Sequence, residues 1–298
     1  MSSGSSININ RLLDEKLVPA DSEVISIHNN LVVISKREAV VSRIGKLSLI
    51  AQREDPGDIT YSHRLAWVSS DVAPVVRPVS EDPIQKEDII ISSFPLREKV
   101  DWSTCNPESI HDMLSYFNGA LTYVSERATL RDFDISEYAQ QRLDYAYHHG
   151  FNHMEILDNT QRILSAHQMA YPFHELTDND PALVHGDLHA GNVVAHKNSL
   201  EIIDLDSVAR GPKLYDIASW RLRQEISDVA PVDRVVDISS KLATWDDESY
   251  RALIGWKIIS SMTNAIRYEK SENLRSRIVE LGRCAHQLDA QLSGKVDK

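Results

Sequence analysis

A polar stretch between residues 183 and 207 restricts the possible folds of this chain more than any other segment. It reads LVHGDLHAGNVVAHKNSLEIIDLDS, with three His, three Asp and two Asn among runs that otherwise look like buried strands. Two short apolar runs, residues 193–195 and 200–203, are separated by the turn-like residues 196–199. Apolar runs joined by a short polar turn are typical of a β-hairpin, so the sequence predicts one here.

Polar side chains lie at both ends of this hairpin. Asp187 and Asn192 come just before its first strand, and Asp204 and Asp206 come just after its second. Because a hairpin brings its two ends together, we expect Asp187, Asn192 and Asp204 to converge at its mouth, with Asp206 nearby. Carboxylate and amide oxygens suit Mg2+, which keeps some of its waters and often bridges to phosphate oxygens. The sequence therefore predicts a site for magnesium and phosphate.

The spacing of these residues matches the catalytic loop of protein kinases. His185, Asp187 and Asn192 fit the pattern H-x-D-x-x-x-x-N. In kinase chemistry the Asp accepts the proton of the attacking hydroxyl and the Asn holds a metal ion. In kinases, a second Asp at the end of a later strand holds the metal that bridges the phosphates. Asp204 follows the second predicted strand of the hairpin, so it corresponds to this Asp.

The segments 184-VHGDLHAGNVV-194 and 202-IIDLDSVARGPKLYDIASW-220 resemble the aminoglycoside phosphotransferase and choline kinase-like superfamily. The resemblance implies an α+β, bilobal, protein-kinase-like fold with a small β-rich N-lobe and a larger, mainly helical C-lobe. It also implies transfer of the γ-phosphate of ATP or GTP, with Mg2+, to a hydroxyl of a small molecule. The specific part of the match covers residues 183–220.

The same resemblance gives roles to individual positions. Asp187 is expected to be the catalytic base, and Asn192 and Asp204 are expected to hold the metal. The supporting positions are His185 and His189, which would shape the loop, Asp216, which would be structural, and Asp206, which would assist metal or substrate.

The phosphates of the nucleotide need a cation on the third strand of a kinase-like sheet. Arg43 in 40-VVSRIG-45 stands at that position, ahead of Lys46 as a candidate. Arginine suits phosphate oxygens because its guanidinium presents a fork of donors. The Glu that normally pairs with this cation is missing from the aligned place in 58-DITYSHRLAW-67.

Two further segments are expected to contact the nucleotide. The turn 28-HNNLVV-33 would cover the phosphates, with Asn30 at its polar position. The segment 91-ISSFPL-96, which includes Ser92 and Phe94, would join the lobes and offer backbone groups to the base.

The rest of the chain predicts a change from β to α structure. We expect a first domain over residues 1–96, with a β-sheet and one helix, and a helical second domain over residues 97–298 that binds the acceptor. The predicted strands cover residues 23–35 (with a turn at residues 29–30), 38–45, 73–79 and 87–94. The predicted helices cover residues 9–16, 59–70, 136–147, 152–168 and 247–269. One more helix starts at residue 107, with apolar positions at 110, 113, 114 and 117, and another starts near residue 214.

Composition limits the partners of the chain. It has 44 acidic and 32 basic residues, for a net charge of −12, so it is a poor candidate for binding nucleic acid. The acidic balance favours a cationic acceptor such as an aminoglycoside or another amino-containing compound. Cys105 and Cys284 lie far apart and form no disulfide framework or zinc motif. The polar start and the lack of a long apolar run predict a cytoplasmic protein without membrane contact.

Several alternatives remain open at this point. Other acceptors are choline or ethanolamine, homoserine and sugars. His185 and His189 could form a zinc pair, which would need a helix and a third ligand. Asp204 and Asp206 could be the DxD motif of a glycosyltransferase, which would need a doubly wound α/β domain ahead of them. Finally, the missing Glu would suit a kinase-like module that binds its ligand without catalysis.

Overall fold

The structure is a computed structural model that describes residues 7, 9–27, 31–46, 59–102, 104–227, 247–268 and 273–283. The chain divides into two compact units, each built from three segments. The first unit consists of Met1–Asp101, Asp112–Leu130 and Gly191–Val208. The second unit consists of Trp102–His111, Arg131–Ala190 and Ala209–Lys298. The predicted functional division at residue 96 stays a prediction.

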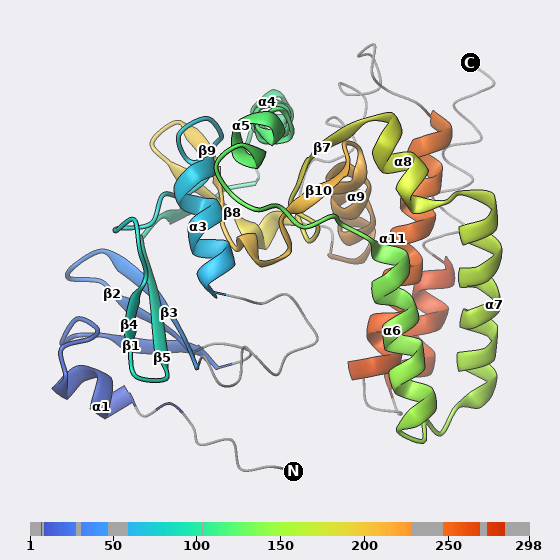
Figure 1. Cartoon of the computed structure of the whole chain (residues 1–298), viewed down its shortest axis with the longest axis horizontal. Coiled ribbons are helices and arrows are strands. Elements are labelled where there is room, and N and C mark those ends of the chain that lie inside the picture. Colours follow the sequence, from blue (N-terminus) through green and yellow to red (C-terminus); the bar gives the residue numbers. More distant parts are fainter. Residues whose placement is uncertain are drawn as a thin grey trace. The chain divides into compact units, whose positions relative to one another are not determined.

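An antiparallel, five-stranded sheet with the order β1-β2-β3-β5-β4 forms the base of the first unit (Figure 1). Its strands are β1 (Glu23–Ile27), β2 (Leu31–Ser35), β3 (Val40–Lys46), β4 (Ile84–Lys86) and β5 (Ile89–Pro95). Val- and Ile-rich runs favour strands because branched side chains pack well on a pleated surface. The strands predicted in residues 23–35, 38–45 and 87–94 are thus confirmed, whereas β4 was not predicted.

One face of this sheet is covered by the N-terminal part of the chain. The helix α1 (Ile9–Asp14) buries Leu12 against the sheet. The buried members of this core are Leu12, Val18, Leu31, Val33, Ile44, Ile89 and Ile91. In β2, buried and half-buried residues alternate, which is the pattern of a strand with one face in the core.

The helix α3 (Ile59–Ser69) packs against β3 and β5 within the same unit. It buries Ile59, Leu65 and Ala66, which recur at helical spacing. Its Tyr61 hydroxyl donates to the carbonyl of Val208 at 2.6 Å, and this bond connects the helix to the end of the third segment of the unit. The predicted helix at residues 59–70 is confirmed.

The predicted hairpin is present in the first unit. β8 (Val193–His196) pairs with β9 (Ser199–Ile202), and β8 also pairs with the short β6 (Glu98–Lys99). The predicted strand at residues 73–79 was wrong, because only an isolated parallel bridge from Val75 to Ile202 forms there. Pro74 and Pro78 lack an N–H donor, so this segment cannot continue a ladder on both sides.

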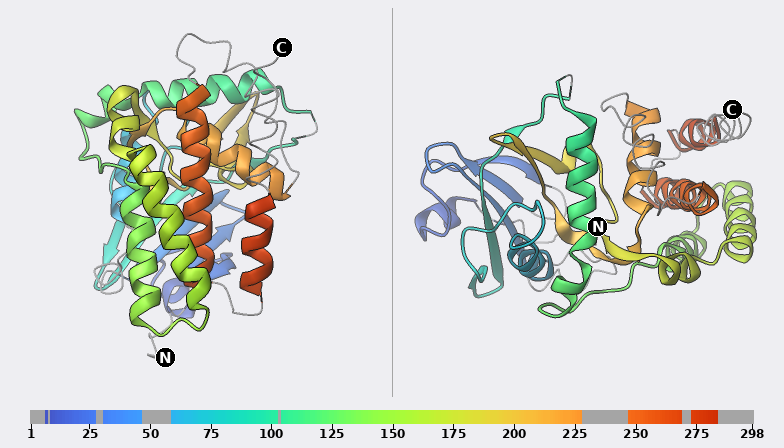
Figure 2. Two further views of the ribbon diagram at one scale, coloured as in Figure 1. Left: turned by 90° about the vertical axis from the view of Figure 1, so that its right-hand side faces the viewer. Right: turned by 90° about the horizontal axis from the view of Figure 1, so that it is seen from above.

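The second unit is mainly helical. Its long helices α6 (Ile135–His148), α7 (Met154–Ala170) and α11 (Asp247–Tyr268) run alongside one another (Figure 2, left). The shorter helices are α8 (Phe173–Asn179) and α9 (Tyr215–Ser227). Asp134 caps α6 by accepting hydrogen bonds from the backbone N–H groups of Ser136 and Glu137.

A short antiparallel pair completes the second unit. β7 (Pro181–Val184) pairs with β10 (Ala209–Pro212), which brings the segments before and after the hairpin together. Neither strand was among the predicted elements, although residues 183–184 looked like buried strand. Two further helices, α4 (Pro107–Gly119) and α5 (Leu121–Ser125), precede α6 in the sequence. Among the described residues, no helix is long and apolar enough to cross a membrane.

Candidate active site

The hairpin of the first unit brings Asn192 and the segment before Asp204 together. The N–H of Ile203 donates to the backbone carbonyl of Asn192 at 3.0 Å. This bond continues the β8–β9 ladder by one step beyond the strands, so the residues at the two open ends become neighbours. Asn192 is buried, and it lines the same cavity as Asp204.

Asp204 has an unusual backbone conformation. Its φ and ψ are 64° and 61°, in the left-handed region, immediately before the 3-10 turn η2 (Leu205–Ser207). A non-glycine residue costs roughly 1–2 kcal/mol there, and Asp is one of the side chains that tolerate it best. Such strain is concentrated at functional sites, where it directs a side chain that a relaxed turn would point elsewhere.

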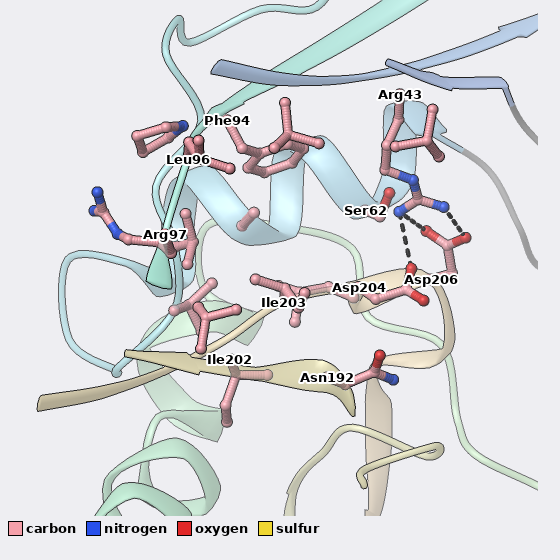
Figure 3. A pocket seen from close by; sticks show the side chains of 18 of the residues that line it. Arg43, Ser62, Phe94, Leu96, Arg97, Asn192, Ile202, Ile203, Asp204 and Asp206 are labelled. Atoms are coloured by element: carbon pink, nitrogen blue, oxygen red, sulfur yellow. Dashed lines mark hydrogen bonds and ion pairs between the residues drawn. The ribbon is translucent and has the colours of Figure 1, made fainter. Parts of the chain in front are cut away.

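Arg43 joins the two carboxylates of this turn. From β3, its Nη1 lies 2.8 Å from Asp206 Oδ1 and 2.9 Å from Asp204 Oδ1, and its Nη2 pairs with Asp206 Oδ2 (Figure 3). The Arg43 side chain is only 17% exposed. Burial opposes its charge, but the charges of Asp206 and then Asp204 outweigh burial and raise the pKa of Arg43. The guanidinium is therefore a permanent, fixed cation.

These side chains form the charged end of a cavity with a volume of about 500 Å3. Its walls are mostly apolar, and Figure 3 shows Phe94 and Leu96 at the end away from Asp206. The apolar part of the lining includes Val32, Val41, Ala66, Val75, Phe94, Leu96 and Ile202. A cavity of this size, with few polar groups at one end, has the character of a small-molecule site. All of its lining residues belong to the first unit.

Ser92 and Phe94, both on β5, have different surroundings. Phe94 lines the cavity, whereas the Ser92 hydroxyl is hydrogen-bonded to His63 Nδ1 at 2.7 Å. The other ring nitrogen of His63 lies 3.1 Å from the carbonyl oxygens of Ser80 and Glu81. Burial lowers the pKa of His63. This neutral histidine connects α3 to β5, so it gives Ser92 a structural role, and nucleotide contact by Ser92 stays a prediction.

In the second unit, Asp216 fixes the loop that carries Asp187. Asp216 is completely buried, and it accepts hydrogen bonds from the N–H groups of His185 at 2.7 Å and Gly186 at 3.1 Å. Burial raises the pKa of Asp216, while these N–H groups and the charges of His185 and Lys257 oppose that rise. Gly186 has a φ of 79°, a conformation that favours glycine.

Asp187 itself lies next to a lysine that the sequence did not indicate. Lys257 Nζ on α11 lies 3.4 Å from Asp187 Oδ1, and it also lies 5.7 Å from the centre of the Tyr215 ring. The Lys257 side chain is 8% exposed and that of Asp187 is 43% exposed. Lys257 interrupts an apolar run in its helix, and this was the one signal in the sequence that could have identified it.

The remaining predicted positions lie as follows. Asn30 lies outside the described residues, as does Cys284. His185 is buried, and His189 is half-buried. Within the described part of the chain, no group of three or more His, Cys, Asp and Glu side chains is placed to hold a metal ion. The zinc alternative for His185 and His189 therefore has no support. The convergence of Asp187 with Asn192 and Asp204 stays a prediction, because Asp187 belongs to the second unit.

Asn192 and Asp204 fit a magnesium ion that is shared with phosphate. They offer an amide oxygen and a carboxylate, the hard oxygen donors that Mg2+ requires. Few protein ligands are needed, since Mg2+ in phosphoryl-transfer sites takes the rest of its ligands from water and phosphate. The ion pair with Arg43 uses one oxygen of Asp204, and an ionised carboxylate can accept further contacts.

Residues 110–253 match the model of a family described as "Phosphotransferase enzyme family". This match confirms the predicted resemblance to the phosphotransferase superfamily. A search of the curated proteins found no match. The antiparallel sheet also excludes the doubly wound domain that the glycosyltransferase alternative required.

Solved structures show the same fold across nearly the whole chain. Amicoumacin kinase hAmiN, in complex with AMP-PNP, Ca2+ and Ami, has a TM-score of 0.68 and 12% identity over 94% of both chains. The GDP complex of aminoglycoside 2'-phosphotransferase-IIIa has a TM-score of 0.63 and 13% identity over 94% of this chain and 97% of that one. A choline/ethanolamine kinase family protein from Mesorhizobium loti has a TM-score of 0.57 and 12% identity, over 88% and 86%. The predicted α+β kinase-like fold is thus confirmed.

Proposed function

We propose that this chain transfers the γ-phosphate of ATP or GTP to a hydroxyl of a small molecule, with Mg2+. The observation that supports this proposal most strongly is the cavity of the first unit, whose apolar walls end at Arg43, Asn192 and Asp204. A nucleotide has the matching polarity, with a flat base at one end and charged phosphates at the other. The family match and the kinase-like neighbours support a small-molecule phosphotransferase.

The nucleotide would lie with its base between the apolar side chains near Phe94 and Leu96. In the lobe-joining segment, Pro95 has no N–H, and the N–H of Leu96 is bonded to the carbonyl of Ala39 at 2.6 Å. The base would therefore depend mainly on apolar contact and backbone carbonyls. Arg43 would face the phosphates, where its forked donors and its permanent charge offset the negative charge of the transferred group.

Asn192 and Asp204 would hold the Mg2+ ion. When bound, such an ion neutralises charge that develops on the phosphate oxygens during transfer. The strained turn at Asp204 and the ladder bond at Asn192 hold both ligands in place before the nucleotide binds. A site organised in advance lowers the cost of reaching the transition state.

Asp187 would act on the acceptor. Its carboxylate would receive the proton of the attacking hydroxyl as the new oxygen–phosphorus bond forms. The bond from the γ-phosphorus to the β–γ bridging oxygen breaks in the same transfer, and a nucleoside diphosphate leaves. Asp216 holds the loop of Asp187 through two backbone N–H groups, and Lys257 compensates the charge of Asp187.

The acceptor is proposed to be a cationic, amino-containing alcohol. The net charge of −12 favours cations, and the neighbours include proteins described as an amicoumacin kinase and an aminoglycoside phosphotransferase. Choline or ethanolamine, homoserine and sugars are the alternative acceptors of the same reaction class. A kinase-like module that binds without catalysis is the second candidate, favoured by the absence of any acidic residue in α3.

A phosphotransfer screen tests the proposal. The chain would be incubated with Mg2+ and either ATP or GTP, against aminoglycosides, amino alcohols and sugars, and phosphorylated product would be detected by mass spectrometry. We expect product from at least one amino-containing acceptor, and none from Asp187→Asn. Nucleotide binding without hydrolysis or transfer under all conditions would favour the silent binding module instead.

A further inference from the structure

The position of Lys257 beside the proposed base depends on how α11 is held within the second unit. Lys257 is buried, and its Nζ lies 3.4 Å from Asp187 Oδ1. Lysine carries a point charge at the end of a flexible stem, so the end stays at one carboxylate only if the backbone below it is fixed. The contact with Asp187 therefore depends on the rotation and the axial position of α11.

Two hydrogen bonds of opposite direction join α11 to α7. From α7, the Nε2 atom of His167 is bonded to the backbone carbonyl of Ala252 on α11 at 2.9 Å. From α11, Trp256 Nε1 donates to the carbonyl of Tyr171, which caps the C-terminal end of α7, at 3.0 Å. Because a carbonyl can only accept, His167 carries a proton on Nε2. Both bonds reach α11 in the turns just before Lys257, so they fix this part of the helix.

Gly255 allows α7 and α11 to approach closely at the same place. A Cβ at this position would lie 2.8 Å from Nε2 of His167 and closer still to Cε1, so it would overlap the ring. The ring is held there by its bond to Ala252 and by edge-to-face packing against Trp256, with 5.0 Å between the ring centres. Glycine inside a helix costs roughly 1 kcal/mol relative to alanine. The helix thus contains a weakening residue where it has to admit the histidine ring.

We propose that His167 and Gly255 are positioning residues that set the reach of Lys257 to Asp187. The imidazole of His167 fills the space that Gly255 leaves, and its bond to α11 fixes the helix in one rotation and at one height. Lys257 follows two positions later and presents its ammonium group to the proposed base. The inference rests on the proposed function and deepens it, since both residues act through Lys257.

A zero-length cross-link measures the contact between Lys257 and Asp187 without any turnover. A water-soluble carbodiimide activates carboxylates and joins them to touching amines by an amide bond, and the 43% exposure of Asp187 gives the reagent access. Mass spectrometry of the digested protein quantifies the linked peptides. We expect the link in the wild type and not in Asp187→Asn. In Gly255→Ala its yield should fall roughly fivefold or more, because the added methyl group forces α11 away from the histidine ring.

Gly282→Ala is the matched control. Gly282 lies in the helical stretch 273–283 of the same unit, and no atom of a distant described residue lies within 4 Å of a Cβ built there. Both substitutions replace a helical glycine by alanine, so the difference between them reports the packing at Gly255. We expect Gly282→Ala to leave the link yield within about twofold of the wild type and the unfolding temperature no lower.

A double-mutant cycle separates the positioning role from general packing. His167→Ala removes the ring, so adding Gly255→Ala to it should change the link yield by less than about twofold. His167→Gln keeps an N–H that can donate to Ala252, and it should retain roughly threefold more of the link than His167→Ala. With an acceptor, kcat should follow the link yield across these variants, and the affinity for AMP-PNP should not change. If Gly255→Ala does not unfold cooperatively, the two His167 variants carry the test.

A folded Gly255→Ala protein with the wild-type link yield would overturn the inference. So would an equal loss from Gly255→Ala with and without the His167 ring, because the effect would then not pass through that ring. Absence of the link in the wild type would overturn the contact itself. Failure of the proposed function looks different, since the wild-type chain would then transfer no phosphate to any acceptor. The expected pattern of link yields would still support the positioning role in that case.

Discussion

Arg43 in the first unit and Lys257 in the second are both nearly buried cations that face aspartates of the proposed site, but they are held in different ways. Arg43 has three contacts to two carboxylates, none longer than 2.9 Å. The distance from Lys257 Nζ to Asp187 Oδ1 is longer, at 3.4 Å. The first arrangement fixes a plane, and the second supplies only a point charge.

The difference agrees with what each region is proposed to do. Phosphate oxygens need donors that are already in place when the nucleotide arrives, and a forked arginine provides them. Asp187 has to exchange its partner, since it must approach the acceptor hydroxyl and take its proton. A weak, long ion pair compensates the carboxylate without competing with the acceptor. The proposed phosphate-binding cation is thus fixed in its orientation, whereas the cation beside the proposed base contributes charge without a fixed plane.

The largest expected effect comes from removing the proposed base. Asp187→Asn keeps the size of the side chain and removes its ability to accept a proton. We expect kcat to fall by roughly 10²–10⁴-fold, the usual contribution of a general base, with the affinity for AMP-PNP unchanged. Steady-state rates and calorimetry check this pair of outcomes. A variant with the wild-type rate would show that Asp187 is not the base.

A smaller effect is expected from replacing the fork by a point charge. Arg43→Lys keeps the charge but loses the bidentate pair with Asp206, so nucleotide affinity should fall by roughly 10–100-fold. The reciprocal change, Lys257→Arg, should leave nucleotide affinity within about twofold of the wild type. If Arg43→Lys bound AMP-PNP as well as the wild type, a positive charge alone would be sufficient for nucleotide binding. The proposed difference between Arg43 and Lys257 would then be wrong.

Lys257→Met should affect the reaction more than nucleotide binding. Without the ammonium group, the negative charges of Asp187 and Asp216 are less well compensated, so we expect kcat to fall on the order of tenfold. The affinity for AMP-PNP should not change, because Arg43 lies in the other unit. Rates measured with saturating nucleotide, together with the unfolding temperature, separate this effect from a loss of folding. An equal loss of nucleotide affinity would contradict the separation of roles.

The smallest effect concerns pH and depends on one histidine in each unit, the buried His63 and the half-buried His167. Burial lowers the pKa of His63 in the first unit and of His167 in the second, while backbone carbonyls that they contact oppose the shift. The unfolded chain therefore binds protons below about pH 6.5 that the folded chain does not. Stability should be full above that pH and should fall as the pH decreases toward the folded pKa values.

Thermal unfolding between pH 7.5 and pH 5 tests this prediction. We expect stability to depend less steeply on pH in His63→Asn and in His167→Asn. Each substitution should remove some, but not all, of the pH dependence of the wild type. His148, whose side chain is exposed and bonded to the carbonyl of Asp144, gives the control His148→Asn with an unchanged slope. Identical slopes in all four proteins would show that neither His63 nor His167 controls the loss of stability at low pH.

Local signals were sufficient for much of the fold and for part of the site. Residues 193–195 and 200–203 are apolar runs joined by a polar turn, which is why the hairpin could be predicted. The strand at residues 73–79 failed because two prolines interrupt its donors. The short strands β4, β7 and β10 have only three or four residues each, too few to show an alternating pattern.

Contacts between distant parts of the chain could not be read in the same way. Arg43 was found through the resemblance, but its partner Asp206 lies 163 positions further along the sequence. Lys257 is 70 positions from Asp187, and within its own helix it looks like a single polar residue among apolar ones. Pairing of this kind is decided by tertiary packing, for which a single sequence has no periodic signal.

The first unit is assembled from three separated stretches of chain, and this has a consequence for its biosynthesis. The sheet, α3 and Arg43 are all synthesised within the first 101 residues, but the third stretch begins only at Gly191. It supplies the partner of Val75 in β9, the carbonyl that accepts from Tyr61, and both carboxylates for Arg43. On the ribosome, these partners of the early stretch are complete only when residue 208 has emerged, so nascent chains truncated before that point should be the ones that chaperones and proteases recognise.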